Sequence, residues 1–395
     1  MTTFPIPNSC VPVTMKRFLS CFLPVLCVLL LASSASAFEL PATPPPELDA
    51  TAWLLIDLSS GQTLAEHDAD RRVEPASLTK LMTAYLVFGA LRQGVIHPND
   101  TVLPSTHAWK TEGSRMFIEP GKPVTIDNLL HGMIVQSGND ATVALAERLG
   151  GSEAGFVSMM NQAAQQLGMT HTHFVTATGL PDPQHYTTAR DLSRVASAIE
   201  REFPQYLPLF SLRDFRYNHI DQSNRNRLLW TDPSVDGMKT GHTESAGYCL
   251  IASAHRGGRR LLSIVLGTPS DALRASESQR LLNYGFQAFD GIRLVRANTA
   301  LASLQVWKGK RAHVRAGSLG NIDLSVPHGR AKDVKISLTT RQPLIAPLYV
   351  GQTIGTITVS LDNQTLTSYP LQSLDNVPVA SVFGRAWDSL MLKFK

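Results

Sequence analysis

The order of strand-like and helix-like segments along residues 52–289 places the strongest limit on the fold of this chain. Residues 52–57 look like a strand, and residues 63–67 are expected to pair back with it as a hairpin across a Ser-Ser-Gly turn at 59–61. Residues from about 126–202 carry mostly helical periodicity. Strand-like runs then return, and a last helix is expected over 271–289. Strands joined by tight turns pair antiparallel, and helices segregated from them pack on the sheet. The sequence therefore predicts an α+β fold in which helices cover an antiparallel sheet.

Turn residues and helix caps mark several individual elements. The Arg-Gly-Gly turn at 256–258 separates the apolar runs 247–254 and 260–267, and this pattern predicts a hairpin. A helix is expected over 77–92, where Leu and Met recur at helical spacing. Residues 188–191, with the sequence Thr-Ala-Arg-Asp, resemble a capping box with Asp in place of Glu.

The pattern changes near Asp290. Residues 291–375 contain short Val, Ile, Leu and Thr runs, punctuated by Gly, Pro and Asn, and carry no helical period. The runs 353–361 and 364–371 flank an Asp-Asn turn and predict another hairpin. We therefore expect a first domain over 38–290, followed by a small all-β sandwich domain.

The first 37 residues have the three-part pattern of a secretory signal peptide. Lys16 and Arg17 precede an apolar run over 18–32, and Ala35-Ser36-Ala37 supplies small residues for cleavage. The alternative is an N-terminal membrane helix, but the apolar run is short for that role. The sequence thus predicts an exported protein.

Cysteine usage fits an exported chain without internal disulfides. Cys10, Cys21 and Cys27 lie in the expected signal peptide, which leaves Cys249 alone in the mature protein. Because Cys249 lies in an apolar run, we expect a small buried side chain rather than a reactive thiol.

Composition and motifs argue against several classes of function. The chain of 395 residues is 43% apolar and 17% charged, which excludes wholesale disorder. Its net charge of +4 involves no long basic run, so no nucleic-acid partner is expected. His171-Thr172-His173 lacks the further ligands of a known metal motif and fits a loop or strand pair better. The sequence therefore predicts no metal and no cofactor.

The final segment, 379–395, has the pattern of an amphipathic helix. One helical face gathers its large apolar side chains, which are Val382, Phe383, Trp387, Leu390, Met391 and Phe394. Fourteen helical residues span about 21 Å, which is less than the ~30 Å hydrocarbon core of a bilayer. We expect this helix to lie in the surface of a membrane. The alternative is a helix packed against its own protein.

Ser77-Leu78-Thr79-Lys80 is the first of three motifs that could carry chemistry. Residues three apart on a helix lie on one face, so the Ser77 hydroxyl and the Lys80 amine can touch. A serine hydroxyl needs a base to become a nucleophile, and a desolvated lysine near another cation can serve. This motif alone is common by chance.

Ser137-Gly138-Asn139 and Lys239-Thr240-Gly241 are the second and third motifs. The former interrupts a helical stretch and would by itself be a turn or cap. The latter begins a strand, where Gly241 would let a substrate backbone approach closely. The three motifs occur in this order, at intervals of 60 and 102 residues.

Together the three motifs resemble those of the penicillin-binding serine DD-peptidases. Gly138 and His242 match the low-molecular-mass D-alanyl-D-alanine carboxypeptidases more closely, as do the flanking residues Gln136, Asp140, Asn224-Arg225-Asn226 and Asp236-Gly237. In that family a catalytic domain precedes a small β-domain and a C-terminal amphipathic anchor, and the resemblance covers nearly the whole mature chain. It implies peptidoglycan pentapeptide as substrate and β-lactam antibiotics as inhibitors.

The resemblance also implies catalytic roles. Ser77 would attack the carbonyl of the penultimate D-Ala and form an acyl-enzyme. Lys80 would act as general base, with its pKa lowered by burial and by Lys239. Ser137 would relay a proton to the leaving amine, and Asn139 would hold the substrate amide.

The family further implies how the substrate is bound. Lys239 would supply positive charge, while Thr240 and Arg274 would bind the terminal carboxylate. Arg274 could instead be an ordinary surface arginine. Backbone N–H groups of Ser77 and His242 would form the oxyanion hole.

Three other functions remain to be weighed. A class A β-lactamase would carry a Glu-x-x-Leu-Asn pattern between the second and third motifs, and none occurs. A DD-endopeptidase that cuts crosslinks usually lacks the β-domain and terminal helix. A penicillin-binding scaffold with dispensable catalysis would not need Ser77, Lys80 and Lys239 intact. The sequence thus favours a carboxypeptidase on the outer face of the inner membrane.

Overall fold

The computed structural model describes residues 43–393 of the chain. The expected signal peptide, 1–37, lies outside the described residues. Phe394, expected on the apolar face of the last helix, lies outside them as well.

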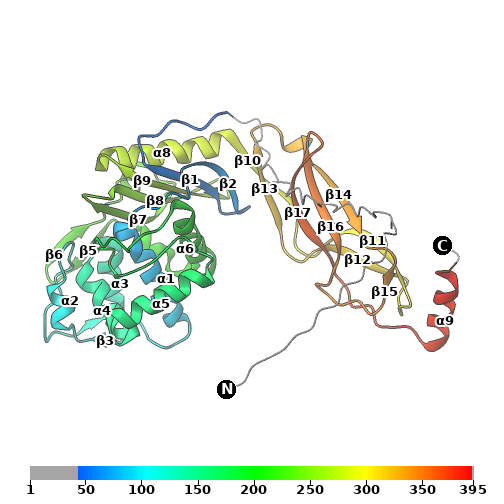
Figure 1. The fold of residues 1–395 in the computed structure, drawn as a ribbon, viewed down its shortest axis with the longest axis horizontal. Helices are drawn as coiled ribbons and strands as arrows, with labels where there is room; N and C mark the ends of the chain where they lie inside the picture. The colour runs from blue at the N-terminus through cyan, green and yellow to red at the C-terminus, as the bar shows by residue number, and fades with distance from the viewer. Residues whose placement is uncertain (1–42, 394–395) are drawn as a thin grey trace, which may run out of the picture. The chain divides into compact units, whose positions relative to one another are not determined.

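Five antiparallel strands form the main sheet, in the order β2-β1-β9-β8-β7 (Figure 1). The strands are β1 (Ala52–Asp57), β2 (Gln62–His67), β7 (Val235–Thr243), β8 (Gly247–Arg256) and β9 (Arg259–Thr268). Gly257 and Gly258 join β8 to β9 with φ angles of 57° and 81°, as a type I′ turn requires. The antiparallel sheet and this hairpin confirm the prediction.

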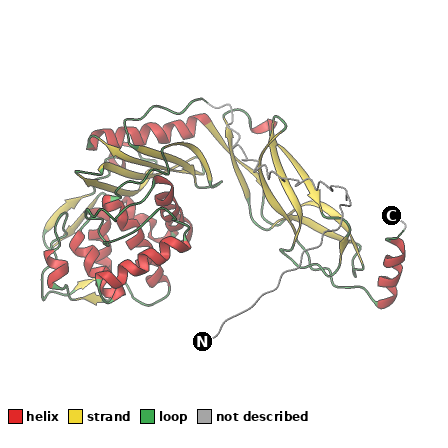
Figure 2. Cartoon of the chain, viewed as in Figure 1, coloured by secondary structure: helices red, strands yellow, loops and turns green. Residues whose placement is uncertain are grey.

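Helices cover both faces of this sheet, as Figure 2 shows. α8 (Asp271–Ala288) packs against β8 and β9, while α1 (Lys80–Arg92) and α6 (Ala189–Glu202) belong to the helical region on the opposite face. The other helices here are α2 (Thr106–Lys110), α3 (Ile126–Val135), α4 (Asn139–Gly150), α5 (Glu153–Gln166), α7 (Leu228–Thr231) and the 3-10 helix η2 (Pro204–Ser211). Two small hairpins complete the region, β3 (Thr101–Val102) with β4 (Val124–Thr125) and β5 (Asp214–Tyr217) with β6 (Ile220–Ser223).

The side-chain alternation of β1 divides the interior into two cores. Leu54 and Ile56 belong to a large core shared with the helical region. Trp53 and Leu55 belong to a second core, which includes Leu281 of α8. Successive side chains of a strand point to opposite faces, so a strand buried on both faces feeds both cores.

The helix expected over 77–92 begins with a different geometry. Ala76–Thr79 form a 3-10 turn, η1, and α1 begins at Lys80 and ends at Arg92. Ala76 has a φ of 47°, in the left-handed region that alanine rarely adopts. The left-handed residue therefore lies immediately before Ser77, ahead of the regular helix.

The expected capping box at the start of α6 is only half made. Thr188 Oγ1 accepts the Asp191 N–H at 3.0 Å, as predicted. The Asp191 carboxylate does not complete the box, because it accepts His171 N–H and the Thr172 hydroxyl, each at 2.8 Å. The side chain therefore ties a distant loop to α6.

The C-terminal domain is built from β-strands, as the sequence predicted. One sheet pairs β10 (Phe289–Val295) with β13 (Ile322–Pro327). The other has the order β14-β16-β17-β12-β11-β15. Its strands are β11 (Thr299–Trp307), β12 (His313–Ser318), β14 (Lys335–Thr340), β15 (Leu344–Ile345), β16 (Thr353–Leu361) and β17 (Gln364–Ser373), and a 3-10 turn, η3 (Ala331–Asp333), precedes β14. Both sheets contribute side chains to one core, as in a sandwich.

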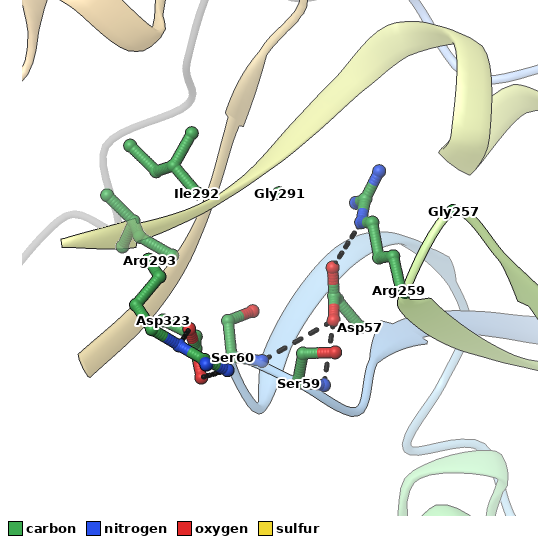
Figure 3. Close-up of a pocket in the computed structure, with 11 residues that line it drawn as sticks. Asp57, Ser59, Ser60, Gly257, Arg259, Gly291, Ile292, Arg293 and Asp323 are labelled. Atoms are coloured by element: carbon green, nitrogen blue, oxygen red, sulfur yellow. Dashed lines mark hydrogen bonds and ion pairs between the residues drawn. The ribbon is translucent and has the colours of Figure 1, made fainter. Parts of the chain in front are cut away.

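A buried polar network connects β1 and β9 with β13. Asp57 is 1% exposed and accepts hydrogen bonds from Ser325 Oγ at 2.6 Å and from Arg259 Nε. Figure 3 shows Asp57 and Arg259 beside a cavity of about 200 Å³, whose wall includes the ion pair of Arg293 with Asp323. The residues expected in the active site do not line this cavity.

The last described helix is α9 (Val382–Met391), within the segment expected to be amphipathic. Ser381 caps it by accepting the Gly384 N–H. Phe383 and Trp387 are 89% and 64% exposed, so the apolar face is not packed against the protein. Within residues 43–393, no helix has the length and apolar character needed to cross a membrane.

Candidate active site

Ser77 lies in η1 and is more accessible than the residues around it. Ala76, Leu78 and Thr79 are buried, whereas Ser77 is half-buried. Thr79 Oγ1 donates to the Ala76 carbonyl at 2.8 Å, which stabilises the left-handed turn before the serine. The structure thus holds the Ser77 hydroxyl on a fixed backbone at the edge of the core.

Lys80 lies one helical turn after Ser77 and is buried. Its Nζ atom lies 2.9 Å from Ser77 Oγ, 2.7 Å from Asn139 Oδ1 and 2.8 Å from the Thr178 carbonyl oxygen. Burial is the main cause that lowers the pKa of Lys80, and the positive charge of Arg225 is the second. Together they bring the pKa to about 7. The amine therefore loses its proton far more readily than an ordinary lysine.

The partners of Lys80 determine how its neutral amine is oriented. A neutral amine has two N–H donors and one lone pair. The Asn139 amide oxygen and the Thr178 carbonyl can only accept, so they take both donors. The lone pair then faces Ser77 Oγ at 2.9 Å, within reach of the hydroxyl proton.

Ser137 and Lys239 form a second polar pair. Ser137 has a φ of 64° at the break between α3 and α4, and its hydroxyl accepts a hydrogen bond from Lys239 Nζ at 3.0 Å. Lys239 also donates to the Thr240 carbonyl at 3.0 Å. Burial is the largest cause of the lowered pKa of Lys239, followed by the positive charges of Lys80 and Arg225. Two buried amines and the Arg225 guanidinium therefore disfavour one another's positive charge in this part of the site.

Asn139 is engaged by the protein itself. Its Oδ1 atom accepts from Lys80, and its Nδ2 atom donates to the Glu112 carbonyl at 2.6 Å. The next residue, Asp140, accepts the N–H groups of Met116 and Phe117, each at 2.9 Å. The resemblance implied that Asn139 holds the substrate amide. In the structure both polar atoms of this side chain bond the protein itself, and one of these bonds holds Lys80 Nζ.

Gly241 allows β7 to pack closely against η1. A Cβ atom at this position would lie 3.1 Å from the Pro75 carbonyl oxygen, 3.2 Å from Leu78 Cγ and 3.3 Å from Ala76 Cβ. The absence of a side chain at this position therefore lets the strand lie against the segment that carries Ser77.

The remaining expected residues lie along β7 and at the start of α8. Thr240 is buried and His242 is exposed, with the His242 ring 3.9 Å from the Tyr248 ring. Arg274 is 4% exposed, which excludes the surface alternative. It donates to the carbonyl of Gly241 at 3.4 Å and forms an ion pair with Asp271. Side-chain hydrogen bonds thus join Ser77, Lys80 and Asn139 in one group. A separate bond joins Ser137 with Lys239. Arg274 contacts the site through the backbone carbonyl of Gly241 in β7.

The comparison with protein families matches two consecutive stretches of the chain. Residues 39–270 match the family model described as D-alanyl-D-alanine carboxypeptidase. The chain belongs to the D-alanyl-D-alanine carboxypeptidase family. Residues 289–379 match the C-terminal domain of penicillin-binding protein 5. The fold class and the resemblance stated from the motifs are thereby confirmed.

Relatives of this carboxypeptidase family match over most of their length. The chain is 41% identical over 357 residues to the D-alanyl-D-alanine carboxypeptidase DacC of Escherichia coli, which covers 88% of this chain and 89% of the relative. The structure of penicillin-binding protein 5 from Haemophilus influenzae matches with a TM-score of 0.83 at 40% identity, over 85% of this chain and 99% of that one. Penicillin-binding protein D2 of Listeria monocytogenes, in its ampicillin-bound form, matches at 32% identity with a TM-score of 0.57. That match covers 62% of this chain and 100% of the other.

Two residues beside the carboxypeptidase motifs were not assigned roles from the sequence. Arg225 lowers the pKa of both Lys80 and Lys239 by its positive charge, although it belongs to an Asn-Arg-Asn stretch quoted only as a family match. Thr178 contributes a backbone carbonyl to Lys80, and a backbone contact leaves no side-chain signal in the sequence.

His185 is a third residue that the sequence analysis missed. It is 2% exposed, and its Nδ1 atom accepts the N–H groups of Val175 at 3.1 Å and Thr176 at 3.3 Å. The ring proton is therefore on Nε2, which donates to Thr79 Oγ1 at 2.9 Å. Burial lowers the pKa of His185 to about 4, so the ring is neutral near pH 7. Through Thr79 and the Ala76 carbonyl, this histidine supports the turn that presents Ser77.

Proposed function

We propose that the protein is a serine-type D-Ala-D-Ala carboxypeptidase. It removes the terminal D-Ala from peptidoglycan pentapeptides through an acyl-enzyme on Ser77, and β-lactam antibiotics inhibit it. The observation that carries this proposal is the geometry of Lys80, whose Nζ atom lies 2.9 Å from Ser77 Oγ while two acceptors hold its N–H groups. The family match and the named relatives support the same reaction.

In the first step, the lone pair of Lys80 accepts the Ser77 proton as Ser77 Oγ attacks the carbonyl carbon of the penultimate D-Ala. Negative charge develops on the carbonyl oxygen, and the backbone N–H groups of Ser77 and His242 stabilise it. Ser137 passes a proton to the nitrogen of the terminal D-Ala as the peptide bond breaks. This leaves an ester on Ser77 and free D-Ala.

The second step hydrolyses that ester. A water molecule loses a proton to a basic group of the site and attacks the ester carbonyl, and Ser77 Oγ regains a proton as the shortened peptide leaves. A β-lactam reacts with Ser77 in the same way, but its amine remains attached to the acyl group. Because the chain lacks the Glu-x-x-Leu-Asn pattern, we expect this adduct to persist.

Three residues near β7 would recognise the terminal carboxylate of the substrate. Lys239 provides positive charge beside Ser137, from which its Nζ atom lies 3.0 Å away. Thr240 offers its hydroxyl, and Arg274 adds positive charge behind the strand through its contact with the Gly241 carbonyl. A free carboxylate next to the scissile bond distinguishes the end of a pentapeptide from an internal peptide bond.

The proposed location is the outer face of the inner membrane, facing the periplasm. The signal-peptide pattern over 1–37 would direct export, after which residues 38–290 form the catalytic domain and 291–375 the β-domain. The segment 379–395 would attach the protein to the membrane surface. The exposed apolar side chains of α9 support this attachment.

The deciding experiment is mass spectrometry of the purified protein after brief exposure to benzylpenicillin, with Ser77→Ala as the control. A lasting adduct on the Ser77 peptide, absent from the variant, is expected. No adduct with penicillin intact would refute the assignment, and no adduct with penicillin hydrolysed would indicate a β-lactamase.

Substrate choice needs a second assay. The protein should release D-Ala from a pentapeptide and leave a crosslinked peptide dimer uncut. Cleavage of the dimer alone would indicate a DD-endopeptidase. Full biological effect of Ser77→Ala in cells would indicate a scaffold.

A further inference from the structure

A group of apolar side chains is exposed on the β-domain, outside the active site. Ile345, Tyr349 and Val350 are 45%, 63% and 49% exposed, and we refer to these three residues as the apolar tip. Between them, Ala346 and Leu348 are buried in the core of the β-domain. Large apolar side chains exposed close together are unusual on a soluble surface and mark interaction sites.

The backbone of the apolar tip is fixed by neighbouring segments. Ile345 belongs to β15, which pairs in parallel with β11 at Trp307. Leu348 pairs with Val377, and the Val350 N–H donates to Asn376 Oδ1 at 2.9 Å. These bonds and the buried residues in between hold the three apolar side chains outward.

The same contacts place the apolar tip beside the chain that leads into α9. Residues 374–381 connect β17 with α9, and Asn376 and Val377 bond the tip segment directly. Further along, the Ala380 N–H donates to the Lys308 carbonyl at 2.7 Å. Val379, between them, is 41% exposed. Exposed apolar side chains therefore occur in the tip, at Val379 in the adjoining connection, and on α9.

Exposed basic side chains lie on segments next to this surface. Lys310, Arg311 and Arg341 are exposed on the segments that border the tip. The acidic groups nearby are bound by the protein, since Asp375 forms an ion pair with Arg315 and Asp388 accepts the Lys308 N–H. Apolar and aromatic side chains bordered by cations match the interface of a bilayer that contains anionic lipid.

We propose that the apolar tip and α9 form one membrane-binding surface, in which the β-domain itself enters the interface of an anionic phospholipid bilayer. This inference deepens the proposed attachment through α9 and rests on it. A rigid tip beside the helix would fix the orientation of the β-domain relative to the membrane plane. A helix on a flexible connection could not do this.

The test measures co-sedimentation of the purified protein with phosphatidylcholine vesicles, with and without phosphatidylglycerol. The double variant Tyr349→Ser/Val350→Ser should bind about tenfold more weakly to the anionic vesicles, because less apolar surface is buried there. The matched control is Ile336→Ser, which removes a side chain 39% exposed on β14 of the same domain and should not change binding. Both variants should retain the circular-dichroism spectrum and thermal unfolding of the wild type, which shows that the β-domain is folded, and both should still form the penicillin adduct at Ser77.

A truncation after Ala380, which removes α9, separates this proposal from the anchor. If truncation abolishes binding and the double variant binds as the wild type does, the anchor is supported and the tip proposal is wrong. If the wild type does not bind anionic vesicles, both are wrong, while the penicillin adduct still tests the proposed catalysis. If the double variant loses a concentration-dependent dimer without a change in vesicle binding, the tip binds a second copy of the chain and the proposal is overturned.

Discussion

His185 Nε2 lies 2.9 Å from Thr79 Oγ1, which connects the loop after α5 to the turn that carries the proposed nucleophile. Thr79 donates its own proton to the Ala76 carbonyl at 2.8 Å. The histidine therefore acts on Ser77 through two hydrogen bonds and the left-handed backbone of Ala76, without touching the serine.

We expect His185→Ala to slow the acylation of Ser77 by benzylpenicillin about ten- to hundredfold, because small displacements of a nucleophile are costly. Non-covalent binding of the drug should change little. His185→Gln retains one donor and one acceptor and should recover part of the rate, as stopped-flow measurement of adduct formation can determine. Equal rates in His185→Ala and the wild type would exclude this positioning role.

The buried histidine should also make stability depend on pH. Its pKa is about 4 in the folded protein, below the ordinary value of 6.5, so the unfolded chain binds a proton more readily. The stabilisation is therefore complete above about pH 6.5 and is lost as the pH falls toward 4, by at most about 1.4 kcal/mol per pH unit. Urea unfolding at several pH values should show a shallower loss for His185→Gln than for the wild type. Parallel curves would contradict this prediction.

Arg225 should set the pH at which Lys80 becomes a base. Its positive charge disfavours the protonated lysine, so Arg225→Gln should raise the pKa of Lys80. On a plot of acylation rate against pH, the rise in rate on the acidic side should then move above about pH 7. Arg225→Lys retains the charge and serves as the control. The pH profile of adduct formation at Ser77 measures the shift, and an unmoved rise in Arg225→Gln would assign the lowered pKa to burial alone.

Asn139→Asp should move the pH at which the acylation rate rises still higher than Arg225→Gln does. The substitution places a carboxylate at the position of Oδ1, 2.7 Å from Lys80 Nζ, and an opposite charge at that distance raises the pKa of the lysine by about 1 to 3 pH units. Acylation near neutral pH should fall at least tenfold and recover at alkaline pH. A loss of rate that alkaline pH does not restore would show that Asn139 acts mainly on the substrate.

Gly241→Ala tests the close packing of β7 on η1. The added methyl group would lie 3.1 Å from the Pro75 carbonyl oxygen, so the strand and the turn must separate slightly. We expect a loss of about 1–3 kcal/mol in stability and about tenfold slower acylation. Gly320→Ala is the matched control, since its Cβ would have no neighbour within 4 Å. A normal acylation rate in Gly241→Ala would mean that η1 tolerates the displacement.

Local patterns in the sequence were sufficient for the sheet and for part of the site. The Gly-Gly turn after β8 and the Asp-Asn turn after β16 depend on left-handed backbone conformations that these residue types adopt readily. Ser77 and Lys80 are separated by one helical turn, so their contact follows from spacing. The three motifs carry the five side chains that the structure joins in two polar groups.

Contacts between distant segments could not be predicted in this way. His185 and Thr79 are separated by 106 residues, and a lone buried histidine has no pattern of its own. Asp191 has the right spacing for a capping box, yet the loop at His171 supplies a competing N–H donor. Ala76 adopts a left-handed conformation although alanine does not favour it, because Thr79 and the packing of Gly241 stabilise the turn.

The alternation of β1 between two cores has a consequence for cooperativity. Leu54 and Ile56 pack with the helical region that carries Lys80, while Trp53 and Leu55 pack with α8 on the far side of the sheet. Neither core can open without removing β1 from the other. The layer under α8 and the layer that holds the active site must therefore unfold in a single transition, so damage to the α8 side reduces the fraction of active molecules without changing any residue near Ser77.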